Sequence, residues 1–175
     1  IYLDGNTANY INAVDSAFTA GGIAIGTYSN LAPVYFDDFR LSEEIAVNES
    51  FIEPSKIHFT PRNDGANWKF IKDGTGNYAY AQRVYDDGQK YHLALMDNKR
   101  LADGAITTRF KLGSPQLTSN ASAFVLFRTD ANNDGYAARV QYNSGSSEFY
   151  LSIWKFLNGK FDSLIGKVYL TGVDV

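Results

Sequence analysis

The chain has 175 residues, of which 15% are aromatic and 20% charged, and its formal net charge is −3. At this length it is most simply one domain that buries a core without covalent cross-links. The absence of cysteine excludes disulfides, thiolate metal sites and cysteine nucleophiles. No basic block and no apolar stretch of about 18 residues occurs, so we expect no nucleic-acid partner and no membrane insertion.

The composition favours β-structure, with 12 tyrosines and 12 phenylalanines against one methionine. We interpret residues 1–41 as the closing strands of a β-domain, because three apolar or aromatic runs there are separated by turn residues. Residues 42–56 are acidic and predict a connector. Residues 57–175 predict the opening and middle strands of the same or the next domain. This order indicates a permuted domain, a unit of a tandem array, or strand exchange with a neighbouring copy.

Alternation with period two dominates the second half of the chain. Residues 105–112 place Ile106 and Phe110 on one face and Arg109 on the other. Residues 122–129 form an almost continuous apolar run, as expected for a central strand. Many short strands with frequent turn signals predict an all-β fold, specifically an antiparallel β-sandwich of the jelly-roll type that is permuted or strand-swapped.

The order of motifs resembles the concanavalin A-like lectin/glucanase superfamily, which includes laminin G-like modules. The resemblance covers most of the chain and rests on these residues: Asp4-Gly5, Gly22, Gly26, Phe36-Asp37-Asp38-Phe39, Trp68, Gly76-Asn77-Tyr78, residues 104–110, Phe127-Arg128-Thr129-Asp130 and Gly135-Tyr136. It implies a jelly roll, and in many members sugar binding. We interpret the chain as a mature or excerpted piece of a longer exported protein, so we expect an extracellular or cell-surface location.

Five residues form a candidate glycan-binding platform. Alternation in residues 148–156 turns Leu151 and Ile153 towards the core and the aromatic residues between them the other way. Sugar sites combine aromatic faces with planar hydrogen-bonding groups. The candidate residues are Arg109, Arg139, Gln141, Tyr150 and Trp154. The alternative is that these aromatic side chains pack under a covering loop or against another subunit.

Two segments are candidate calcium sites. Asp130, Asn132 and Asp134 have the spacing of a calcium loop, although Gln141 stands where such a loop carries its bidentate acid. The alternative is a polar hairpin loop. The superfamily resemblance implies a second, structural calcium on the final strand, bound first by Asp38 and alternatively by Asp37. The competing interpretation there is a bulge residue that caps backbone amides.

Other motifs are weaker. Asn48 and Asn120 each begin an N-glycosylation triplet. Neither the Glu-x-Asp-x-x-Glu string of glucanases of this fold nor a Ser/His/Asp spacing is present, so no catalytic residue is predicted.

These observations lead to three hypotheses. The first is a non-catalytic extracellular carbohydrate-binding or adhesive jelly-roll module with structural calcium, whose partner is a glycan. The alternative is a structural subunit of a surface filament or tandem-repeat protein, whose partners are neighbouring copies of itself joined by strand exchange. The third is a polysaccharide hydrolase or lyase.

Overall fold

The computed structural model describes residues 2–3, 6–28, 33–42, 47–49, 59–62, 65–72, 78–83, 90–97, 100–112 and 120–170. The strands of the first half are β1 (Tyr2–Leu3), β2 (Asn6–Tyr10), β3 (Gly22–Tyr28), β4 (Val34–Ser42), β5 (Val47–Glu49), β6 (Phe59–Pro61) and β7 (Trp68–Lys72). Those of the second half are β8 (Tyr78–Gln82), β9 (Tyr91–Met96), β10 (Ala105–Leu112), β11 (Ala121–Thr129), β12 (Gly135–Asn143), β13 (Glu148–Leu157) and β14 (Lys160–Tyr169). Within the described residues no helix is long and apolar enough to span a membrane.

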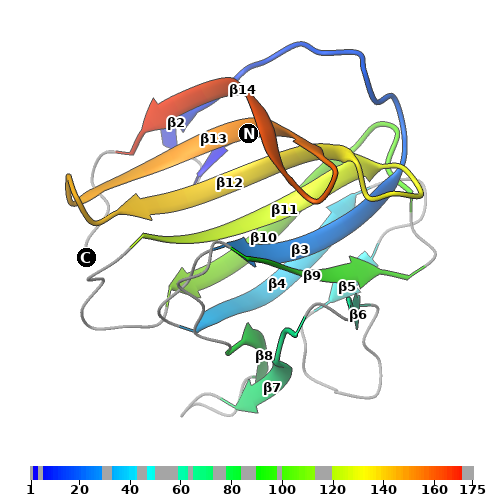
Figure 1. The fold of residues 1–175 in the computed structure, drawn as a ribbon, viewed down its shortest axis with the longest axis vertical. Helices are drawn as coiled ribbons and strands as arrows, with labels where there is room; N and C mark the ends of the chain where they lie inside the picture. Colours follow the sequence, from blue (N-terminus) through cyan, green and yellow to red (C-terminus); the bar gives the residue numbers. More distant parts are fainter. Residues whose placement is uncertain are drawn as a thin grey trace.

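The strands form two antiparallel sheets that pack face to face (Figure 1). The seven-stranded sheet has the order β14-β13-β12-β11-β3-β9-β6, and the five-stranded sheet has the order β10-β4-β8-β7, with β5 also paired to β4. β1 and β2 form a separate ribbon whose second strand lies beside β14. The predicted all-β, antiparallel sandwich is therefore confirmed, whereas its jelly-roll connectivity stays a prediction.

Strands from residues 1–41 occupy the middle of both sheets. β3 lies between β11 and β9, and β4 lies between β10 on one side and β8 on the other. β3 and β4, two of the strands that we interpret as closing strands, thus pair with strands from residues 78–129 of the same chain. The predicted connector, residues 42–56, contains β5, which pairs with the second half of β4. The division of the chain into domains stays a prediction.

The sandwich core lies between the sheets, because each strand turns alternate side chains towards the opposite layer. Its main members are Ile23, Ile25, Met96 and Val125 from the seven-stranded sheet, and Val34, Phe36, Phe39, Leu41, Trp68 and Tyr80 from the five-stranded sheet. We call the side of the seven-stranded sheet that faces this core its inner face and the opposite side its outer face.

The outer face carries a second apolar cluster, rich in aromatic rings. Its members are Ala24, Leu93, Phe124, Leu126, Ala137 and Phe156, with Tyr28, Tyr91, Leu95, Trp154 and Phe161 packed against them. The hairpin that joins β13 and β14 curls over this face (Figure 1), and the Phe161 N–H donates a 3.1 Å hydrogen bond to the Tyr91 hydroxyl. Gly26 makes room for the cluster, since a Cβ there would lie 2.4 Å from the Phe124 ring.

Candidate functional site

Strand register gathers most of the predicted platform on the outer face. In the β12–β13 pair, Arg139 lies opposite Ser152, and Gln141 opposite Tyr150. Trp154 lies opposite Ala137, so it belongs to the same face. On β14, the neighbours of Ser152 and Tyr150 are two residues that sequence reasoning missed, Lys167 and Tyr169. We call these six residues the outer-face cluster: Arg139, Gln141, Tyr150, Trp154, Lys167 and Tyr169.

Arg139 is a buried cation enclosed by aromatic rings. The residue is 6% exposed, and its guanidinium carbon lies 4.5 Å from the ring centroid of Phe161 and 5.1 Å from that of Tyr28. Among the described residues no carboxylate pairs with it, and its Nε has no hydrogen-bond partner. Burial lowers the pKa of Arg139 to about 10. Ring quadrupoles offset part of the cost of keeping this charge out of water.

Lys167 forms the exposed counterpart of Arg139. Its Nζ lies 3.9 Å from the ring centroid of Tyr150 and 4.4 Å from that of Tyr169. The same Nζ donates a 3.2 Å hydrogen bond to the Tyr169 hydroxyl. Tyr169 is 54% exposed, so its ring and the ammonium group are accessible at the edge of the sheet. Two cations therefore flank Tyr150, one buried and one exposed.

The remaining two members of the cluster are Trp154, which is partly buried, and Gln141, which is buried. Trp154 donates its Nε1–H to the Ser152 hydroxyl at 3.0 Å, and its ring centroid lies 5.7 Å from that of Phe161. Gln141 is buried, and its Oε1 has no partner within the described part of the chain. Trp154 thus packs against the aromatic cluster, and the Gln141 Oε1 is a buried acceptor without a hydrogen bond among the described residues.

Arg109 lies in a different place. It belongs to β10 in the five-stranded sheet, where its exposed guanidinium forms an ion pair with Asp38 at an Nη2–Oδ2 distance of 2.7 Å. Because β10 pairs with β4 and not with β12 or β13, the structure does not bring Arg109 to the outer-face cluster.

Asp37 and Asp38 sit at a β-bulge in β4. The register with β10 shifts between Thr107 and Arg109, and Asp38 has a φ of 48°. The Oδ1 of Asp37 accepts a 2.8 Å hydrogen bond from the N–H of Asp38. This geometry is the amide-capping bulge that the sequence offered as the alternative to calcium binding.

Asp130 and Asp134 likewise bind backbone amides, in the loop between β11 and β12. Asp130 Oδ1 accepts the N–H of Asn132 at 2.8 Å and that of Asp134 at 3.0 Å. The Oδ1 of Asp134 accepts the Asn158 N–H at 2.6 Å. In the described part of the chain, no group of three or more His, Cys, Asp or Glu side chains is placed to hold a metal ion. Calcium at either segment stays a prediction.

The two predicted glycosylation acceptors lie in different settings. Asn48 lies in β5. Asn120 is exposed just before β11, and its Oδ1 accepts the Ser144 N–H at 3.1 Å. The serine of that triplet, Ser122, is buried inside β11. Glycosylation stays a prediction at both positions.

One of the two histidines lies within the described residues. His58 lies outside the described residues. His92 is buried in β9, where alternation turns it away from Tyr91 and towards the inner face.

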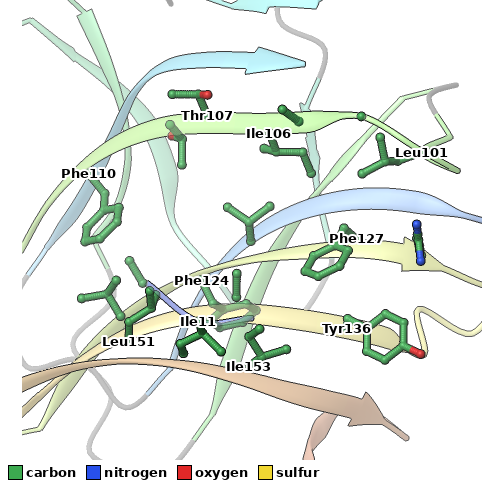
Figure 2. A pocket seen from close by; sticks show the side chains of 18 of the residues that line it. Ile11, Leu101, Ile106, Thr107, Phe110, Phe124, Phe127, Tyr136, Leu151 and Ile153 are labelled. Carbon is green, nitrogen blue, oxygen red and sulfur yellow. The ribbon is translucent and has the colours of Figure 1, made fainter. Parts of the chain in front are cut away.

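A groove borders the inner face of β12, β13 and β14, where the five-stranded sheet ends at β10. Its volume is about 920 Å³. Figure 2 shows Ile106 and Phe110 of β10 on one side and Leu151, Ile153 and Ile11 on the other. No sequence signal predicted this space, because it depends on how far one sheet extends over the other.

Asp15 closes one end of the groove with a polar network. Its carboxylate accepts a hydrogen bond from the Tyr136 hydroxyl and pairs with Lys155 at an Oδ2–Nζ distance of 2.8 Å. The Lys155 hydrogen bond, followed by those from Tyr136 and the Ala17 N–H, lowers the pKa of Asp15 to about 2. The network ties residues 11–17 to β12 and β13.

Comparisons with known proteins identify no family, relative or similar structure for this chain. A scan against protein-family models, a search of curated proteins and a search of solved structures each return no match to this chain. The superfamily resemblance therefore rests on the sequence motifs alone, and function has to be inferred from the geometry of the chain itself.

Proposed function

We propose that this protein is a non-catalytic carbohydrate-binding or adhesive module, of the concanavalin A-like kind and extracellular or at the cell surface, that binds glycan on its outer-face cluster. The observation that carries the proposal is the strand register, which sets Arg139, Gln141, Tyr150 and Trp154 on one face beside Lys167. Such a face combines rings with planar hydrogen-bonding groups.

The cluster suits sugars for two reasons. The accessible ring of Tyr169 offers a flat apolar surface to a pyranose, and guanidinium and amide groups bond hydroxyls in their own plane. Arg139 and Gln141 are already fixed by burial, at 6% and 8% exposure. Binding therefore costs little additional side-chain entropy at these two positions.

Charge favours an acidic glycan. Arg139 and Lys167 place two cations on this face, on either side of Ser152, and the acidic side chain that β13 adds to the face, Glu148, lies four residues from Ser152. A sugar carboxylate or sulfate would form charge-assisted hydrogen bonds with the guanidinium and ammonium groups. We therefore expect polyuronates or sulfated polysaccharides to bind more tightly than neutral ones.

Affinity electrophoresis in gels that contain polygalacturonate or xylan tests this proposal. Polygalacturonate should retard the wild-type protein more than xylan does, and Lys167→Met should lose most of the retardation. Lys111→Met is the matched control, because Lys111 is exposed on β10 in the other sheet. Unretarded migration of the wild type in every glycan, or equal losses in the two variants, would refute the proposal.

Structural calcium is part of the same proposal, at Asp38 with Asp37 or at Asp130, Asn132 and Asp134. A ligand at a hundredfold excess over its Kd stabilises the folded state by about 2.7 kcal/mol, which corresponds to roughly 5–10 °C in Tm for a chain of this size. Thermal denaturation with calcium and with a chelator should show this difference, and Asp38→Asn or Asp130→Asn should remove it. Identical Tm values in the two buffers would eliminate calcium.

A second candidate function is a subunit of a surface filament or tandem-repeat protein. It is favoured by β10, which pairs with β4 alone among the described strands and borders the apolar groove.

A further inference from the structure

Within the described part of the chain, the smaller sheet ends at an edge of β10 that pairs with no other strand. Among the described strands β10 has one neighbour, β4, so its other edge presents backbone N–H and C=O groups without a ladder partner. Residues 104–110 line the groove along this edge. An exposed strand edge beside an apolar surface is a template for the addition of another strand.

The surface beside this edge is the apolar inner face of β12 and β13. Val140, Leu151 and Ile153 are 7%, 3% and 7% exposed and form one cluster with Ile11, which stands at the far side of the groove. β10 directs Ile106 and Phe110 to the same space. A strand placed here would bury alternate side chains against aliphatic groups on both sides.

The size of the groove matches one strand. With about 3.4 Å of rise per residue, about 4.8 Å between strands and about 10 Å between sheets, a strand residue in a sandwich occupies about 160 Å³. The groove volume of about 920 Å³ therefore holds about six residues. This length agrees with the seven residues, 104–110, that line the groove along the edge of β10.

The charged side chains on the outward side of β10 indicate which residues a bound strand should carry there. The outward side chains of β10 include Arg109 and Lys111, and Arg40 is exposed next to them on β4. The nearby acid, Asp38, is partly buried at the bulge and already paired with Arg109. Cross-strand neighbours of opposite charge are favourable, so acidic residues fit the outward positions of an added strand.

We propose that this groove is a strand-acceptor site. It binds an extended peptide of about six residues that pairs with β10, turns apolar side chains towards Val140, Leu151 and Ile153, and turns acidic side chains outwards beside Arg109 and Lys111. The partner is thus a protein segment with alternating apolar and acidic residues. This site lies on the inner face and is independent of the proposed glycan site.

The test uses a fluorescent synthetic peptide of alternating valine and glutamate and measures anisotropy against protein concentration. We expect saturable binding, with affinity reduced by about tenfold or more when a central valine is replaced by proline, which removes a ladder donor. In the complex, amide hydrogen exchange in residues 105–110 should slow by about tenfold or more, because strand addition occupies the free edge.

Two protein variants check the geometry. Ala138→Phe fills the groove and should abolish binding, whereas Lys160→Glu, at the distant start of β14, should bind like the wild type. Lys111→Glu should reduce the affinity for the valine–glutamate peptide by about threefold and increase the affinity for a valine–lysine peptide by a similar factor. This exchange of preference would not arise from a general loss of folding.

Three results would overturn the proposal. The first is the absence of any anisotropy change with either peptide. The second is binding that persists in Ala138→Phe or leaves exchange in β10 unchanged. The third is a dimer of the protein alone, seen by sedimentation and lost in Ala138→Phe, which would assign the groove to a second copy of this chain.

Discussion

The two faces of β12, β13 and β14 differ in a way that their sequence alternation alone does not suggest. The outer face carries charged and amide side chains, yet Arg139 is buried there against aromatic rings and Gln141 is also buried. The inner face is aliphatic, yet Leu151 and Ile153 border open space. Polar groups are packed where a sheet surface is usually solvated, and a groove remains beside apolar groups that are themselves buried. Both departures are costly for folding alone, so each face is a candidate binding surface.

The largest expected effects are the losses in free energy of unfolding caused by core substitutions on the two faces. Phe156 is fully buried in the outer aromatic cluster, with its ring centroid 5.3 Å from that of Tyr91, and Phe156→Ala should cost about 3–5 kcal/mol. Leu151→Ala on the inner face should cost about 2–3 kcal/mol, since that site already borders the groove. Urea denaturation measures both values. A larger cost for Leu151→Ala would mean that the inner face is as tightly packed as the outer.

The next effect is the change in free energy of unfolding when Arg139, the buried cation of the outer face, is replaced. Replacement of a buried ion pair by well-packed apolar side chains is often neutral or stabilising by about 1–4 kcal/mol, and at Arg139 ring contacts stand in place of a carboxylate partner. Arg139→Met should therefore preserve or raise the free energy of unfolding while it abolishes binding to acidic glycans. Arg139→Ala is the control and should be destabilised, because it leaves a cavity among the rings. If Arg139→Met lowered the free energy of unfolding, the role of Arg139 would be to stabilise the fold and not to bind glycan.

The smallest effect lies at the end of the groove, where Asp15 joins residues 11–17 to β13. The folded-state pKa of about 2 lies below the ordinary value of 3.8. The carboxylate therefore stabilises the fold fully above about pH 4, and this contribution is lost as the pH falls towards 2. Denaturation midpoints between these values should decline less steeply in Asp15→Asn than in the wild type. Asp103→Asn, at a fully exposed carboxylate, should follow the wild type.

The sequence predicted which way most side chains point. Alternation turned Leu151 and Ile153 inwards and Tyr150 and Trp154 outwards, and the structure has the same arrangement. It also placed Arg139 on the polar side of its strand. The burial of Arg139 was not predictable, because it results from the β13–β14 hairpin that folds over the face and contacts Tyr91, a residue distant in the sequence.

Strand pairing and bulges explain the other differences. The separation of Arg109 from the cluster depends on β10 pairing with β4, which alternation within one strand cannot reveal. Lys167 and Tyr169 were missed because β14 is bulged: its register with β13 shifts beside Trp154, so simple alternation across residues 160–169 breaks. A search for cationic and aromatic residues two positions apart would have found this pair.

Chemical-shift mapping separates the two faces within one experiment. Isotope-labelled protein is titrated with an oligogalacturonate, and backbone amide shifts are followed to saturation. We expect the largest shifts at Tyr150, Lys167 and Tyr169 on the outer face, and no change at Ile106 and Phe110 beside the groove. Shifts centred on the groove, or none at any concentration of the glycan, would contradict the assignment of glycan binding to the outer face.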